Sequence, residues 1–238
     1  TVYPVASCND KDFQNLMHVY LDAVFYPNIH NEKKIFQQEG WHYDLQSPED
    51  ELTINGVVYN EMKGAFSSPD DVLNRSMMEA LYPDTTYGVE SGGDPEVIPE
   101  LTYEAFLDFH GKYYHPSNSY IYLYGNMDMA EKLEFIDKEY LSKYDYLEVD
   151  SEIAWQKPFG AESRVMIKDY PISDSENEEE SAYLSLNFCL VKTLDKELIE
   201  AFDIIDYALC SAPGAPLKQA LTDQKVGKEV YSMLETSM

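Results

Sequence analysis

The segment from Gly56 to Gly64 places one acidic residue in the middle of what would be the apolar face of a helix. If the helix starts at Val57, the residues three and four positions from Glu61 lie on the same face. These neighbours are all apolar or small: Val57, Val58, Gly64 and Ala65. Burying a lone carboxylate is costly, so we expect Glu61 to have a partner: a cation, a metal ion or strong hydrogen-bond donors.

Hydrophobic residues recur with helical spacing along much of the chain, and shorter alternating runs between them predict strands. The predicted helices cover residues 12–26, 31–39, 57–66, 69–81, 103–114, 129–144, 194–210 and 217–223. The predicted strands cover residues 119–124, 164–169 and 182–191, and residues 41–45 are expected to be extended before a turn at 47–50. This alternation favours an α/β (α+β) fold with a mixed sheet packed against helices.

The periodicity lapses between residues 147 and 160, which indicates a linker. We therefore predict a first domain over residues 1–146 and a second over residues 161–238. The chain starts at Thr1 and stops at Met238 without an obvious closing element, so we expect both ends to be cuts in a longer polypeptide. The expected architecture is one truncated domain followed by the start of a second, similar domain.

The charge balance argues against several partners. The chain carries 44 Asp and Glu against 17 Lys and Arg, a formal charge of -27, which repels phosphate backbones and anionic membrane surfaces. No apolar run is long enough to span a bilayer. We expect neither a nucleic-acid nor a membrane partner. The acidic surface could gather cationic peptides or could serve only to keep the protein in solution.

The cysteines bear on the compartment. The three cysteines, Cys8, Cys189 and Cys210, lie too far apart for a zinc ribbon or a disulfide framework. This favours a reducing compartment, and we predict a cytoplasmic location, with an organellar or exported parent protein as the alternative.

Seven ordered motifs resemble the presequence-protease branch of the M16 (pitrilysin/insulinase) metallopeptidases. The resemblance is strong from about residue 3 to residue 158 and weak beyond it. The motifs, in chain order, are Asp12–Leu16, Tyr20–Ala23, Gln38–Trp41, Gly56–Phe66, Ser91–Pro95, Ile98–Thr102 and His115–Asn118. The resemblance implies an M16-like fold, with residues 1–146 as the C-terminal part of the first, zinc-binding domain.

The resemblance also implies a zinc site. Members of this family bind zinc through an inverted His-x-x-Glu-His motif and a glutamate on a later helix, and Glu61 matches that later ligand. No His-x-x-Glu-His occurs in this sequence, and none of the five histidines has a companion four residues away: His18, His30, His42, His110 and His115. We expect the two histidine ligands and the catalytic base upstream of residue 1. No catalytic residue is therefore assigned in this chain, and Glu61 is its one predicted metal ligand.

Two functions follow from the resemblance. The first is a fragment of a zinc-dependent metalloendopeptidase that hydrolyses unfolded peptides by metal-activated water attack, inactive without the rest of its polypeptide. The alternative is a non-catalytic M16-like subunit that binds peptides or assists assembly. The expected partners are peptide substrates and the missing remainder of the polypeptide, and the oligomeric state is left open. Without the resemblance, a glutamate on an apolar helix face most often pairs with an arginine or stands at the end of an element.

Overall fold

The computed structural model describes residues 1–160, 163–177 and 181–236. The chain forms two compact units, Thr1–Ser185 and Leu186–Met238, which are described separately below. The linker predicted at residues 147–160 stays a prediction.

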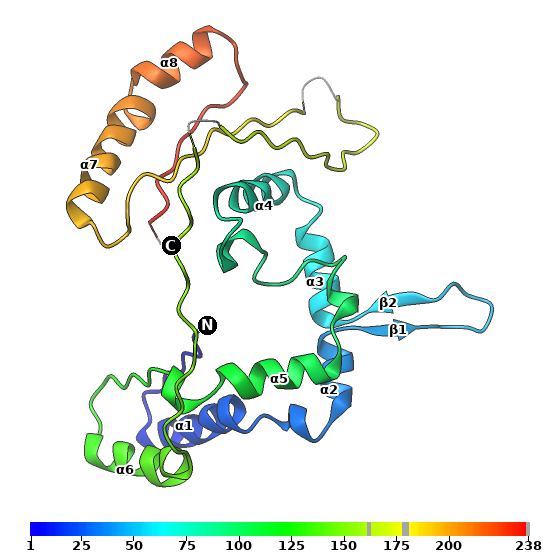
Figure 1. The fold of residues 1–238 in the computed structure, drawn as a ribbon, viewed down its shortest axis with the longest axis vertical. Helices are drawn as coiled ribbons and strands as arrows, with labels where there is room; N and C mark the ends of the chain where they lie inside the picture. Colours follow the sequence, from blue (N-terminus) through cyan, green and yellow to red (C-terminus); the bar gives the residue numbers. More distant parts are fainter. Residues whose placement is uncertain (161–162, 178–180, 237–238) are drawn as a thin grey trace. The chain divides into compact units, whose positions relative to one another are not determined.

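The first unit is mainly helical (Figure 1). Short 3₁₀ turns join its helices, and the sequence accounts for several helix starts: the side chains of Asn9, Ser68, Thr102 and Asp128 each accept a hydrogen bond from a backbone N–H in the first turn. The helices are α1 (Asp10–Phe25), α2 (Lys33–Glu39), α3 (Val57–Ala65), α4 (Pro69–Leu81), α5 (Tyr103–Tyr113) and α6 (Met129–Glu139). The 3₁₀ turns are η1 (Asn28–His30), η2 (Thr86–Gly88), η3 (Ile98–Glu100), η4 (Pro116–Asn118) and η5 (Leu141–Lys143).

One antiparallel hairpin lies between α2 and α3. Strand β1 (His42–Asp44) pairs with β2 (Thr53–Asn55), with Tyr43 opposite Ile54. The backbone N–H of Asp50 donates to the carbonyl of Ser47 at 3.0 Å, which closes the turn predicted there. The combination of helices with this small sheet agrees with the expected α+β fold class.

Two aromatic clusters, each with a buried phenylalanine, contribute to the core of the first unit. In the first, Phe25 and Tyr26 of the α1 end pack against Tyr140 and Tyr144 around η5, with Tyr140 only 2% exposed. In the second, Phe36 of α2 packs against Tyr103 and Phe106 of α5. Together they hold α1 beside α6 and α2 beside α5.

The second unit contains α7 (Lys196–Asp206), a π-helical turn η7 (Tyr207–Ser211) and α8 (Pro216–Asp223). Asp195 caps α7 by accepting from the N–H of Leu198. Ala215, just before α8, is buried. The predicted helix 194–210 is thus an α-helix whose last turn widens into a π-turn.

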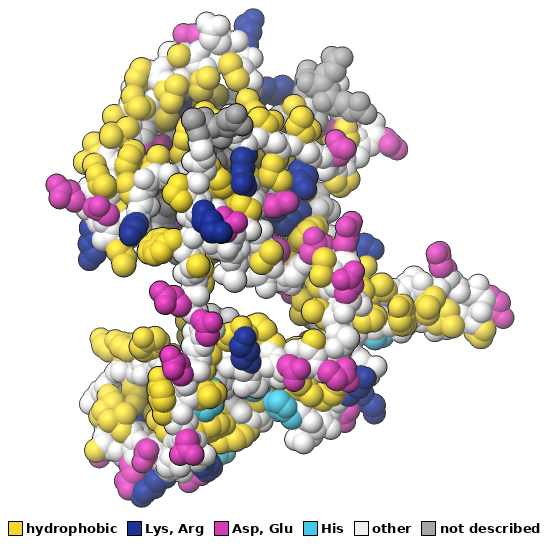
Figure 2. Space-filling model, in the orientation of Figure 1, with side chains coloured by type: hydrophobic (Ala, Val, Ile, Leu, Met, Phe, Trp, Pro, Cys, Tyr) yellow, Lys and Arg dark blue, Asp and Glu magenta, His cyan; other side chains and the backbone are white. Residues whose placement is uncertain are grey.

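The three strands predicted at 119–124, 164–169 and 182–191 are wrong: over the described ranges, the structure forms strands only in the β1–β2 hairpin. Tyr122, Ile167 and Leu184 are 84%, 87% and 87% exposed. Alternating side chains make a strand only where a neighbouring strand supplies the hydrogen-bond ladder. In the parts of the chain that the structure describes, no such ladder forms at these segments. Figure 2 shows many hydrophobic side chains at the surface of the face in view.

Two further features bear on the expectations from sequence. The cysteines are free thiols, with Cys8 and Cys189 exposed and Cys210 half-buried. Within the described residues, no helix combines the length and the hydropathy needed to cross a bilayer.

Candidate functional site

Helix α3, which carries Glu61, begins at a close backbone contact. Gly56 is buried, and a Cβ on it would lie 2.2 Å from the carbonyl oxygen of Gly40 and 2.8 Å from the Cα of Trp41. The side-chain oxygen of Asn55 then accepts from the N–H of Gly56 at 2.8 Å and from the amide of Asn60 at 2.6 Å. Only glycine fits at position 56, and the asparagine pair holds the first turn beside it.

A glycine-rich loop packs against the same helix. A Cβ on Gly92 would lie 2.4 Å from the sulfur of Met62. Gly93 adopts φ +95°, in the left-handed region that favours glycine, and it contacts the buried side chain of Ile98. The loop therefore lies on α3 and leads directly into η3.

Four of the motifs that carried the family resemblance meet around α3. Trp41 adds the remaining link, since its indole N–H donates to the carbonyl of Leu101 at 2.9 Å. Segments up to 60 residues apart in sequence thus contact one another here. The four motifs are Gln38–Trp41, Gly56–Phe66, Ser91–Pro95 and Ile98–Thr102.

The expectation that Glu61 is buried is wrong. Its side chain is exposed, and so are three of its four neighbours on the helix face: Val57 is 51% and Val58 37% accessible, and a Cβ on Gly64 would meet nothing within 4 Å, whereas Ala65 is half-buried. The face that packs inward is a different one, formed by the half-buried side chains of Tyr59, Met62 and Phe66. Arg75 covers Phe66, with its Cζ 3.3 Å from the ring centroid.

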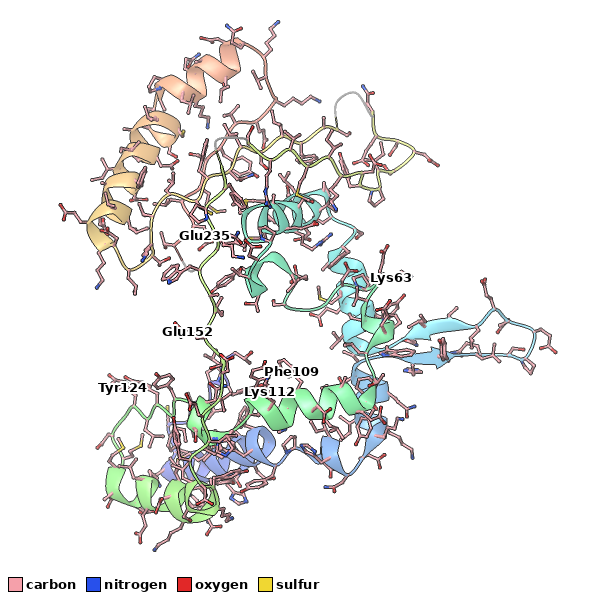
Figure 3. The ribbon with its side chains drawn as sticks, viewed as in Figure 1. Lys63, Phe109, Lys112, Tyr124, Glu152 and Glu235 are labelled. Carbon is pink, nitrogen blue, oxygen red and sulfur yellow. The ribbon has the colours of Figure 1, made fainter. Side chains whose placement is uncertain are left out.

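The apolar pattern around Glu61 therefore marks an open face of α3, not the packed one. Within this chain Glu61 sits in water and needs no partner to offset burial. Figure 3 labels Lys63, two positions further along the same helix. The case for Glu61 as a ligand rests on its motif and on the contacts that hold α3, and not on burial.

The described residues do not make a complete metal site. No group of three or more His, Cys, Asp or Glu side chains that could hold an ion occurs among them. A catalytic zinc ion takes three protein ligands, and Glu61 offers one carboxylate. The residues of this chain alone therefore do not fit a zinc ion at α3.

The five histidines make contacts elsewhere. His42 Nδ1 lies 2.7 Å from the carbonyl oxygen of Gln37, and His115 accepts from the N–H of Ser117 at the start of η4. His18 contacts Tyr140 of the aromatic core. His30 and His110 contact each other, an association that the sequence reasoning missed because the two residues are 80 positions apart.

Comparison with known proteins places these features in a family. The model of the "Peptidase M16 inactive domain" matches residues 100–237, more than half of the chain. Protein HypA of Clostridium perfringens (strain 13 / Type A) is 55% identical over 237 residues, which cover 100% of this chain and 24% of that protein.

Presequence proteases give further matches. Presequence protease 1, chloroplastic/mitochondrial, of Arabidopsis thaliana is 42% identical over 235 residues, 98% of this chain and 22% of the relative. The mitochondrial presequence protease of Danio rerio is 35% identical over 235 residues, 98% of this chain and 23% of the relative. The chain thus spans about a quarter of the length of these relatives. On the family match and these presequence-protease relatives, the chain belongs to the M16 family of metallopeptidases.

Proposed function

We propose that the chain is part of a zinc-dependent metalloendopeptidase that hydrolyses unfolded peptides. In this proposal Glu61 is one ligand of the zinc ion, and the other ligands and the catalytic base come from residues outside the chain. By itself the chain is inactive. The names of the two presequence-protease relatives support a peptidase. The greater length of all three relatives supports a contribution from the remainder of the polypeptide.

The convergence of four motifs on α3 is the observation that carries this proposal. A backbone contact with Gly40 and the packing of the Gly92–Gly93 loop on the side chain of Met62 hold the helix at two places, so the Cα of Glu61 has a defined position. Its carboxylate is accessible, and the exposed Val57 and Val58 on the same face could pack against a further helix. A zinc ion bound there would supply Lewis acidity to the reaction.

The domain organisation is part of the proposal. Residues 1–146 form the C-terminal part of a first M16-like domain, residues 147–160 are a linker, and residues 161–238 begin a second M16-like domain. The location stays a prediction: cytoplasmic from the sequence, whereas the names of two relatives cited above specify mitochondria or chloroplasts.

The test uses the complete polypeptide that contains this chain. Zinc content by elemental analysis and hydrolysis of an unfolded peptide are measured for the wild type, Glu61→Gln and a control, Glu79→Gln. Glu79 is an exposed carboxylate on α4 that lies 3.5 Å from Lys168, so it matches Glu61 in charge but belongs to another helix.

We expect about one zinc ion at the α3 site of each wild-type molecule, and loss of that ion and of hydrolysis in Glu61→Gln. The rate should fall by ~100-fold or more, since a catalytic metal contributes several kcal/mol to transition-state stabilisation. Glu79→Gln should behave like the wild type. Full zinc content and activity in Glu61→Gln would contradict the assignment of this ligand. The upstream sequence gives a second test, because the proposal requires a His-x-x-Glu-His there.

A second function has support from one observation. The family model that matches residues 100–237 describes an inactive domain, which fits a non-catalytic subunit that binds peptides or assists assembly. This alternative predicts a wild-type polypeptide that holds no Glu61-dependent zinc ion and binds the unfolded peptide without cleaving it. Glu61 lies outside the matched range, so the match does not argue against its role as a ligand.

A further inference from the structure

His30 and His110 form a pair that the proposed function does not use. His30 ends the turn η1, and His110 lies on α5, next to the Phe109 labelled in Figure 3. His30 Nε2 is 3.2 Å from His110 Nδ1, and the ring centroids are 5.1 Å apart with an interplanar angle of 67°. Two imidazole nitrogens from separate elements thus face each other.

The second nitrogen of His110 fixes the protonation of its ring. His110 Nε2 lies 3.0 Å from the carbonyl oxygen of Val24, which can only accept, so Nε2 carries the hydrogen. In the neutral ring Nδ1 therefore presents its lone pair toward His30. The ring also stacks on Tyr114, with centroids 4.6 Å apart, so its orientation is held from two sides.

This arrangement is the one that metal-binding histidines usually have. Such a histidine donates its other ring N–H to a carboxylate or a backbone carbonyl, which sets the tautomer and the ring orientation. Two nitrogens at 2.0–2.1 Å from a tetrahedral ion are about 3.3 Å apart, close to the separation found here. His30 is exposed, so it can turn its own hydrogen to Nδ1 and offer Nε2 as the second ligand.

The surroundings favour a neutral imidazole and a bound cation. His110 borders a small groove of about 230 Å³ with mostly apolar and aromatic walls, among them Pro27, Ile29 and Phe106. Partial burial there lowers the pKa of His110 from its ordinary value of 6.5, which leaves the ligand form dominant at neutral pH. The formal charge of -27 of the whole chain raises the concentration of cations around the protein.

We propose that His30 and His110 form a two-imidazole binding site for a divalent transition-metal ion of the zinc class, with water in the remaining positions. Imidazole is a good ligand for Zn²⁺, Cu²⁺ and Ni²⁺. No third protein ligand is present among the described residues, so the affinity is modest. The site is separate from α3 and does not depend on the role proposed for Glu61.

The test measures Zn²⁺ binding to the complete polypeptide by equilibrium dialysis at micromolar free Zn²⁺. The samples are the wild type, His30→Asn, His110→Asn and the control His42→Asn. His42 is a matched control because its ring also contacts a backbone carbonyl but has no histidine partner at hydrogen-bond distance in the described structure. His30→Asn is the decisive variant, since its exposed side chain can be replaced while the bond from His110 to Val24 remains.

We expect His30→Asn and His110→Asn to bind one Zn²⁺ ion fewer than the wild type, with the affinity of the lost site reduced at least tenfold, and His42→Asn to be unchanged. Ring ¹⁵N spectra should show Zn²⁺ shifting His30 Nε2 and His110 Nδ1. If His30→Asn binds as many ions as the wild type, the pair is only a hydrogen bond and the proposal is overturned.

The same samples separate this proposal from the proposed function. Glu61→Gln should lose peptide hydrolysis and its own zinc ion but keep the His30-dependent ion, whereas His30→Asn should keep hydrolysis. A polypeptide that is inactive yet still binds the His30-dependent ion would overturn the proposed function alone.

Discussion

The backbone of Gly56 lies so close to that of Gly40 that a Cβ on Gly56 would be 2.2 Å from the Gly40 carbonyl oxygen. This contact joins the start of α3 to the end of α2 and thereby fixes the position of Glu61. Because the obstacle is backbone and not a flexible side chain, it cannot move aside without displacing one of the two helices.

Gly56→Ala should accordingly displace α3 and destabilise the protein. Overpacking of this kind costs about 1–3 kcal/mol, and the backbone contact argues for the upper part of that range. Urea unfolding followed by circular dichroism measures the change. Zinc content of the complete polypeptide should fall as well, if Glu61 is a ligand.

The matched control is Gly64→Ala on the same helix. A Cβ on Gly64 meets nothing within 4 Å, and alanine is the better helix former by about 0.5–1 kcal/mol, so this variant should be slightly more stable than the wild type. Equal effects of the two substitutions would show that close packing at Gly56 does not position α3.

Tyr140 links α6 to α1 through its hydroxyl. The hydroxyl donates to the carbonyl oxygen of His18 at 2.9 Å, and the ring is almost fully buried. Tyr140→Phe keeps the aromatic packing and removes this bond, so the free energy of unfolding should drop by about 1 kcal/mol. Tyr122→Phe, at a position 84% exposed, should have no effect in the same denaturation experiment. A loss in both variants would point to a general effect of removing a tyrosine hydroxyl.

The helices of this chain were predictable because their signals are local. Thr102 caps α5 and Pro69 opens α4, and both are residue types that favour these positions at the start of a helix. The predicted helix 129–144 is also present as α6, but it ends at Glu139 and continues as η5. Capping and periodicity depend on residues within a few positions, so a single sequence contains them.

Features that depend on distant segments were not predictable in the same way. The alternation in Tyr120–Tyr124 indicated a strand, yet a strand also needs a neighbour, which no local pattern supplies. The inward face of α3 is chosen by Gly40 and Gly92, so an apolar pattern around Glu61 could not reveal that this face is exposed. The pairing of His30 with His110 joins residues with no sequence relationship at all.

Protonation of His110 should weaken the fold as the pH falls. Partial burial and the neighbouring His30 lower the pKa of His110, although its bond to the Val24 carbonyl opposes the shift. A histidine with a lowered pKa binds protons less readily when folded than when unfolded. The contribution of His110 to the free energy of unfolding is therefore fully present above its ordinary pKa of 6.5. It is lost as the pH falls toward the lower pKa of the folded protein.

The groups that face this ring are His30, Tyr114 and the Val24 carbonyl, with Tyr3 bonded to the Tyr114 hydroxyl. Burial and the bond to Tyr114 raise the pKa of Tyr3 to about 12, far from the acidic range. His110 is thus the group in this cluster whose lowered pKa carries the expected pH dependence.

The measurement is the free energy of unfolding by urea at several pH values from about 7.5 down to about 5, a range that spans the ordinary histidine pKa, for the wild type and His110→Gln. The difference in the free energy of unfolding between the wild type and His110→Gln reports on His110 separately from the other four histidines. This difference should shrink as the pH falls. Protonated Nδ1 of His110 would face the N–H of His30, so the donor and acceptor roles of the two rings must change in the same interval, as ring ¹⁵N shifts would report. A difference that stays constant across this range would mean that His110 keeps the same pKa in the folded and unfolded protein.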